Sequence, residues 1–88
     1  MGNNDSGGSK LENADLENAD LRGADLENAD LRRANLRNAD LRGADLSLAN
    51  IQDIELEYAI LEKATLDQNQ FNHLKDRYDL RSVIKNVL

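Results

Sequence analysis

Leucine recurs every five residues through most of this chain of 88 residues. From Leu11 to Leu66, twelve consecutive positions at this spacing hold Leu or, once, Ile. Alanine stands two residues before most of them, and Asp or Asn lies between the two in the eight units from Asp15 to Asn50. An internal repeat this regular is interpreted before any other signal, because it determines the whole architecture.

A five-residue period fits neither a helix nor a flat strand. On an α-helix each step rotates the Leu by about 140°, so no apolar stripe forms. On a strand, an odd period sends successive Leu to opposite faces. A chain that turns a corner at every unit satisfies the pattern, because Leu and Ala then both point inward and four sides close a square coil. The segment DLRGADL, at 20–26 and again at 40–46, lies above its own copy in such a coil, and successive coils are expected to pair like parallel strands about 4.8 Å apart.

The motif Ala-(Asp/Asn)-Leu-X-X, as in Ala19-Asp20-Leu21-Arg22-Gly23, resembles the pentapeptide-repeat family. The resemblance covers roughly two thirds of the chain. It implies an all-β solenoid, a right-handed quadrilateral β-helix of about three coils.

The chain divides into three segments. Residues 1–9 (MGNNDSGGS) are predicted to be a disordered tail, and residues 10–66 form the β-helix. Residues 67–88 break the repeat and are predicted to form a short C-terminal α-helical cap, since Asp67 and Gln70 fit a capping box. The apolar residues of this segment are the predicted contacts of the cap, or of a homodimer formed through that end of the solenoid: Phe71, Leu74, Tyr78, Leu80, Ile84 and Leu88.

The net charge of -6 argues against a nucleic-acid partner and is compatible with a basic protein partner. On the square coil, one side stacks acidic residues without any cation: Asp25, Glu27, Asp45 and Asp67. This side is either a docking surface for a basic partner or a solvated face that provides solubility and register. The second interpretation also predicts ion-pair ladders between coils, such as Glu17–Arg37–Glu57.

Three apolar residues of the second and third coils, Leu48, Tyr58 and Ile60, occupy positions that should point outward. They either mark a contact site for a partner or lie beneath the C-terminal segment folded back over them. The sequence leaves both open.

No catalytic constellation, metal site or cofactor site is predicted. The single His73 lies in the expected helix, no nucleophile motif is present, and Gly23 and Gly43 are interpreted as turn residues. The absence of Cys and of any long apolar run predicts a cytoplasmic protein that has no membrane contact.

The favoured hypothesis is a non-catalytic structural or protein-interaction module that presents side chains on a rigid square β-helix, as a monomer or a homodimer. The resemblance implies an alternative, because some family members act as acidic DNA mimics that bind a topoisomerase such as gyrase, inhibiting it or protecting it from quinolones. The short rod and the Arg residues on two of its sides count against that alternative.

Overall fold

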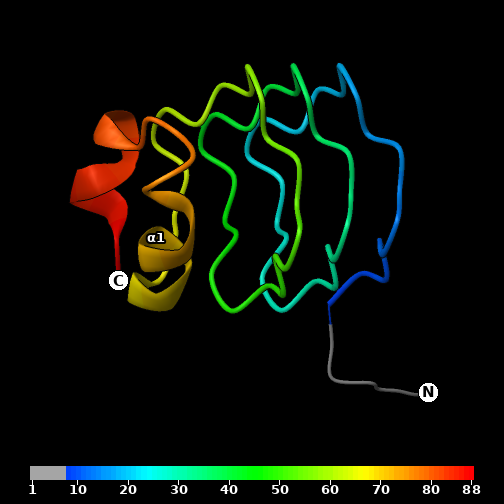
Figure 1. Cartoon of the computed structure of the whole chain (residues 1–88), viewed down its shortest axis with the longest axis horizontal. Coiled ribbons are helices and arrows are strands. Elements are labelled where there is room, and N and C mark those ends of the chain that lie inside the picture. Colours follow the sequence, from blue (N-terminus) through cyan, green and yellow to red (C-terminus); the bar gives the residue numbers. More distant parts are fainter. Residues whose placement is uncertain (1–7) are drawn as a thin grey trace.

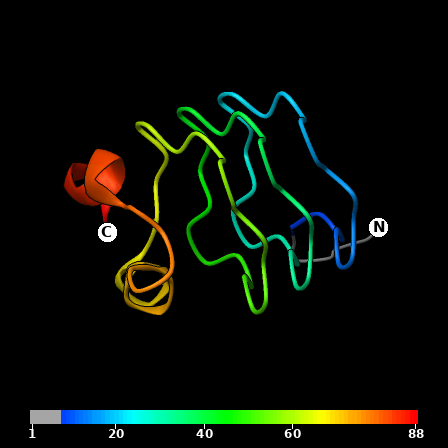
Figure 2. The ribbon, with the colours of Figure 1, turned by 45° about the horizontal axis from the view of Figure 1, so that its top comes forward.

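The computed structural model describes residues 8–88, so residues 1–7 of the predicted tail lie outside the described residues. The chain winds through stacked four-sided coils, and its C-terminal segment lies at the far end of the stack from the first coil (Figures 1 and 2). The Ser9 carbonyl accepts a hydrogen bond from the Asp30 N–H at 2.8 Å. Ser9, the last residue of the predicted tail, therefore already takes part in the bonding between coils.

Parallel bridges join residues twenty positions apart, and each column of bridged residues marks one side of the solenoid. The four columns are Lys10, Asp30 and Asn50 on the first side, Asp15, Asn35 and Glu55 on the second, Asp20, Asp40 and Ile60 on the third, and Asp25, Asp45 and Thr65 on the fourth. Each bridge is isolated, whereas the sequence predicted strand-like pairing. The difference arises because the chain turns again within five residues, which leaves one bridged residue on each side.

Each side ends in a tight turn, in which the Leu carbonyl accepts a hydrogen bond from the N–H of the residue three positions later. The Ala34 N–H, for example, donates to the Leu31 carbonyl at 3.0 Å. The third residue of each turn, from Asn13 to Lys63, has φ between 58° and 72°. These corner residues are Asn13, Arg33 and Asp53 at the first corner, Asn18, Asn38 and Tyr58 at the second, Gly23, Gly43 and Lys63 at the third, and Asn28 and Leu48 at the fourth. Glycine and asparagine suit this left-handed conformation, so the prediction that Gly23 and Gly43 are turn residues is confirmed.

Every backbone N–H of a unit in the second coil has a partner. Residues 34–38 show the pattern, with bonds of 2.8–3.1 Å. Three N–H groups donate to carbonyls of the neighbouring coils: Asn35 to Ala14, Leu36 to Glu55 and Asn38 to Glu57. The other two donate within the turns, Ala34 to the Leu31 carbonyl and Arg37 to Asn35 Oδ1. The bond to Asn35 Oδ1 recurs wherever Asp or Asn precedes the Leu, from Asp15 to Asn50. The Asp/Asn position thus supplies the one acceptor that the coil backbone lacks.

Leucine and alanine from the four sides fill the interior. Leu31, Leu36 and Leu41 in the second coil have no exposed surface, and Ala34, Ala39 and Ala44 are equally enclosed. In the first coil Leu11 and Leu16 are only partly buried, because no earlier coil within the described residues covers them. Ile54 replaces Ala in the third coil and is 1% exposed, so it fills the core towards the C-terminal end.

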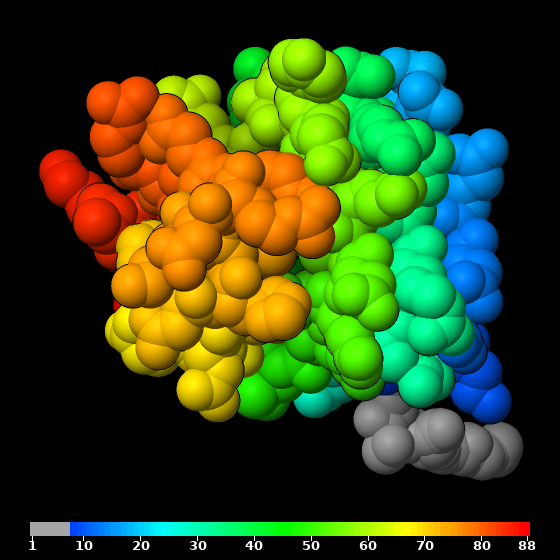
Figure 3. Space-filling model, in the orientation of Figure 1, coloured from blue at the N-terminus to red at the C-terminus, as the bar shows by residue number. Residues whose placement is uncertain are grey.

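The C-terminal segment contains the helix α1 (Gln68–Leu74) and the 3₁₀ helix η2 (Arg81–Asn86). Asp67 and Gln70 form both bonds of a capping box at 2.9 Å. Figure 3 shows the yellow and orange atoms of this segment against the green atoms of the third coil. Neither helix in residues 8–88 has the length and apolar character needed to cross a membrane.

Candidate functional site

The fourth side carries a cluster of carboxylates. Asp25, Glu27 and Asp45 each place one carboxylate oxygen within 4.8 Å of the others. Asp25 and Glu27 are exposed and Asp45 is partly buried. No ion pair reaches these three residues from anywhere in residues 8–88. We call this set the acidic cluster.

Asp67, the fourth acidic residue predicted on this side, has a structural role. Its Oδ1 accepts from the Gln70 N–H at 2.9 Å as the N-cap of α1. Its Oδ2 accepts a hydrogen bond from the Leu48 N–H at 3.0 Å. At other corners the equivalent N–H donates to a backbone carbonyl of the following coil, as the Asn28 N–H does to Ser47. Asp67 therefore joins the second coil to α1, and the acidic cluster does not include it.

On the third side, by contrast, arginine neutralises the carboxylates. Arg22 donates from Nε and Nη2 to the two oxygens of Asp20 at 2.9 and 2.8 Å, and Arg42 clamps Asp40 in the same way. The hydrogen bonds from Arg22 lower the pKa of Asp20 to about 2. On the first side, the hydrogen bond from Arg32 likewise lowers the pKa of Asp30 to about 2. Such two-point contacts leave little charge for a partner on these sides.

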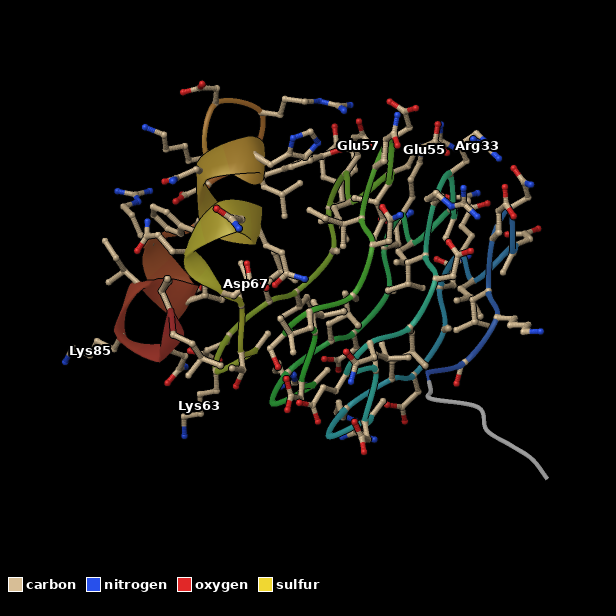
Figure 4. All side chains as sticks on the ribbon, turned by 90° about the horizontal axis from the view of Figure 1, so that it is seen from below. Arg33, Glu55, Glu57, Lys63, Asp67 and Lys85 are labelled. Carbon is tan, nitrogen blue, oxygen red and sulfur yellow. The ribbon has the colours of Figure 1, made fainter. Side chains whose placement is uncertain are left out.

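Ion pairs between coils are present: Arg32 contacts Glu12 at 3.3 Å, and of the predicted Glu17–Arg37–Glu57 ladder the contact of Arg37 with Glu57 is confirmed. Arg37 lies 3.1 Å from Glu55 and 3.8 Å from Glu57, and these two glutamates lie along one edge of the molecule in Figure 4. The predicted contact of Arg37 with Glu17 is wrong, because the guanidinium reaches towards the third coil.

The acidic cluster has some, but not all, features of a cation site. Ca²⁺ takes six to eight oxygens, more than three carboxylates supply by themselves. Two of the three already accept hydrogen bonds within their turns, Asp25 from the Glu27 N–H at 3.1 Å and Asp45 from the Ser47 N–H and hydroxyl at 2.9 and 2.6 Å. The arrangement is better suited to exposed, unpaired negative charge than to a closed metal site.

The three outward apolar residues remain exposed: Leu48 is 63%, Tyr58 86% and Ile60 47% exposed. The alternative in which the C-terminal segment covers them is therefore wrong. Leu48 lies at the fourth corner, diagonally across the coil from Tyr58 at the second. Only Tyr58 and Ile60, two residues apart, form one patch.

The predicted cap contacts divide into buried and exposed groups. Leu74 and Leu80 are 2% and 4% exposed and belong to the same core as the coils, and Phe71 packs against that core. Ile84 and Leu88 are 59% and 72% exposed. Of these five residues, only Ile84 and Leu88 are accessible for a dimer contact.

Two polar side chains of the segment bond to the coils, Gln70 to the second and Tyr78 to the third. The buried Gln70 donates from Nε2 to the carbonyls of Leu46 and Ala49 at 2.5 and 3.0 Å. The Tyr78 hydroxyl accepts from the Leu56 N–H at 3.2 Å. Tyr78 is thereby turned towards the coil, away from the dimer role predicted for it.

The description "Pentapeptide repeats (8 copies)" matches residues 9–47. Two solved structures are similar over 68% of this chain: Rfr23, a pentapeptide repeat protein from the cyanobacterium Cyanothece 51142, at 47% identity and a TM-score of 0.57, and alr5209, a pentapeptide repeat protein from Nostoc Pcc 7120, at 40% identity and a TM-score of 0.54. The chain belongs to the pentapeptide-repeat family. It spans 37% of the length of Rfr23 and 66% of that of alr5209, and no curated protein matches it. These neighbours give the solenoid its class, a right-handed β-helix.

One pentapeptide-repeat feature of the C-terminal segment was not predicted from the sequence. Asp79-Leu80-Arg81 repeats the tripeptide of 20–22, 30–32 and 40–42. Arg81 clamps Asp79 at 2.9 and 2.6 Å, which lowers the pKa of Asp79 to about 2, and Leu80 is buried as a coil leucine is. The recurring DLR was the available signal, although it lies outside the five-residue register.

Proposed function

We propose that this pentapeptide-repeat protein is a non-catalytic interaction module whose acidic cluster docks a basic segment of a partner protein. The observation that carries the proposal is the unpaired charge of Asp25, Glu27 and Asp45, whose carboxylate oxygens lie within 4.8 Å of one another. A basic segment would find there several carboxylates held at a fixed spacing by a rigid backbone.

The fold does not need this charge. Asn35 and Asn50 make the same turn bond as Asp25 and Asp45, at 3.1 and 3.2 Å, with an amide oxygen. Two like charges at this separation repel by about 1 kcal/mol in water before salt screening. Asparagine would therefore be the more stabilising choice on the fourth side, and a partner that pairs with the carboxylates accounts for the aspartates.

Residues 67–88 act, in this proposal, as a cap that keeps the solenoid from pairing end to end. An open end exposes backbone groups and an apolar layer, which invites association with another chain. The bonds that Gln70 and Tyr78 make to the second and third coils support this role, as does the burial of Leu74 and Val83 at 2% and 0%.

The test uses isosteric removal of charge. The variant Asp25→Asn/Glu27→Gln/Asp45→Asn keeps the turn acceptors and removes the cluster's charge. The probe is a fluorescent Lys/Arg-rich peptide, with binding measured by anisotropy at physiological ionic strength. The affinity is expected to fall at least about tenfold in this variant, that is by about 1.4 kcal/mol.

A matched control removes the same number of charges elsewhere, as Asp15→Asn/Glu17→Gln/Asp53→Asn. This control should bind nearly as the parent does. An equal loss of affinity in both variants would mean that only net charge matters, and the acidic cluster would then be a solubility feature.

The DNA-mimic alternative is tested separately in a gyrase supercoiling assay with and without a quinolone. Within residues 8–88 the aspartate column on the fourth side has two members, Asp25 and Asp45, one coil apart, whereas duplex DNA carries one charge per about 1.7 Å of its axis. We therefore expect no inhibition and no protection, and a clear effect in the assay would favour mimicry over the module proposed here. Cytoplasmic location also stays a prediction.

A further inference from the structure

The third coil departs from the two coils beneath it along its third side. Each column of the solenoid allows this comparison within one chain, because residues twenty apart occupy equivalent places. The columns read Asn18, Asn38 and Tyr58 at the second corner, Asp20, Asp40 and Ile60 on the third side, and Gly23, Gly43 and Lys63 at the third corner. Three columns of this side thus change character in the same coil, and the column between those of Ile60 and Lys63 changes as well, from Arg22 and Arg42 to Glu62.

None of the three replacements favours the fold. Tyr58 and Lys63 both have φ of 63°, in the left-handed region that side chains other than those of Gly, Asn and Asp disfavour. Ile60 has no side-chain oxygen. In the lower coils, Asp20 and Asp40 each use one to accept a hydrogen bond from the N–H of the residue two positions later. Tyr58 is 86% exposed and Ile60 47% exposed, so burial does not offset these losses. Strain and exposed apolar surface at one place indicate a contact function.

The same side also carries unpaired positive charge. Lys63 and Lys85 line a groove of about 540 Å³ between the third corner and η2, and both project from the C-terminal end of the molecule in Figure 4. Neither lysine lies in an ion pair within residues 8–88. Ile84, 59% exposed, lines the groove with them. The remaining lining residues are Glu62, Arg81, Ser82 and Asn86.

We infer that the surface formed by Tyr58, Ile60, Lys63, Ile84 and Lys85, here called the third-coil surface, binds an acidic peptide segment that also carries apolar side chains. The two ammonium groups complement carboxylates, and the exposed aromatic and aliphatic side chains supply the apolar area that anchors an interface. Three exposed apolar side chains lie beside the two lysines, which favours a protein segment with apolar residues over a nucleic acid as the anionic partner. This surface is opposite in charge to the acidic cluster, so either proposal can fail without the other.

The experiment is a titration followed by ¹⁵N–¹H correlation spectra of the full chain. The probe is a synthetic peptide of about ten residues, roughly 33 Å when extended, in which Glu alternates with Leu and Phe. Saturable shifts are expected at the amides of residues 58–63 and 82–86. A peptide with Lys in place of every Glu, and a thymidine oligonucleotide of similar length, should cause no saturable shift there.

The decisive variant restores the turn chemistry of the lower coils, as Tyr58→Asn/Ile60→Asn/Lys63→Gly. Asn and Gly occupy the equivalent corners of the lower coils, and Asn35 and Asn50 show that Asn supplies the turn acceptor without placing a carboxylate beside Glu62. The variant should therefore fold at least as stably as the parent, and loss of binding cannot be attributed to unfolding. The concentration of acidic probe at half-saturation should rise at least tenfold. The control is Leu48→Asn, which introduces at the fourth corner the residue found at Asn28. This control should leave the half-saturating concentration of the acidic probe unchanged.

Several results would overturn the inference. These are the absence of saturable shifts with the acidic probe, shifts confined to other residues, unchanged affinity in the restored variant, or equal binding of the basic probe. Tighter binding of the oligonucleotide at the same amides would assign the surface to nucleic acid instead.

Discussion

Gly43→Ala tests how much the left-handed corners contribute to stability. Gly43 has φ of 72°, and a Cβ added there would meet only the Gly23 nitrogen, at 3.9 Å, which is ordinary contact. The substitution therefore changes the backbone energy with no steric clash. The left-handed conformation costs a residue with a Cβ about 1–2 kcal/mol, and the smaller entropy of the unfolded alanine chain returns about 0.4–1 kcal/mol. We expect a net loss of about 1 kcal/mol, or roughly 4–8 °C in Tm for a domain of this size.

The assay is urea and thermal unfolding followed by circular dichroism, with Gly43→Asn as the matched variant. Asparagine occupies several equivalent corners, including Asn38, and tolerates the left-handed region better than alanine does. Its loss should be clearly smaller than that of Gly43→Ala. If alanine proves as stable as asparagine at this position, the corner conformation does not limit stability and the reasoning above is refuted.

Two further predictions concern the C-terminal segment and pH. Gln70→Ala leaves the Ala49 carbonyl without its side-chain donor and the Leu46 carbonyl with only the Ala49 N–H, so unfolding in urea should show a loss of about 1–3 kcal/mol; a loss below about 0.5 kcal/mol would mean that water replaces the amide freely. The hydrogen bonds from arginine lower the pKa of Asp20 and of Asp79 from 3.8 to about 2, so their stabilising contribution is complete above about pH 4 and disappears as the pH falls towards 2. Tm should fall over this interval, less steeply at high salt, and a constant Tm would contradict the assignment.

The coil was predictable because a single geometric fact, the five-residue spacing of Leu, excludes helix and strand alike. The sequence also placed the acidic residues of the fourth side correctly, since a lap of 20 residues sets which columns stack. Asp67 could not be assigned in the same way. Its carboxylate serves the start of α1 and the Leu48 N–H together, a role that depends on where the chain leaves the coil.

Ion-pair partners were the least predictable feature. Column position alone makes Glu17 and Glu57 equivalent neighbours of Arg37, one coil below and one above. In the structure Arg37 pairs with Glu55 and Glu57. The rotamer and local hydration of a long side chain determine its partner, and the repeat pattern specifies neither. The corner residues show a different limit: the spacing locates the turns, but the positive φ at Tyr58 and Lys63 becomes apparent only from the backbone.

The lap of twenty residues also fixes the angle between distant surfaces. Removing a single unit of five residues between Asp45 and Tyr58 would preserve the inward Leu and Ala of every remaining unit, yet it would rotate everything downstream by a quarter turn about the long axis. The angle about the long axis between the third-coil surface and the acidic cluster is thus set by the number of units between them. Duplication or loss of whole units would change this angle while the interior packing stays intact.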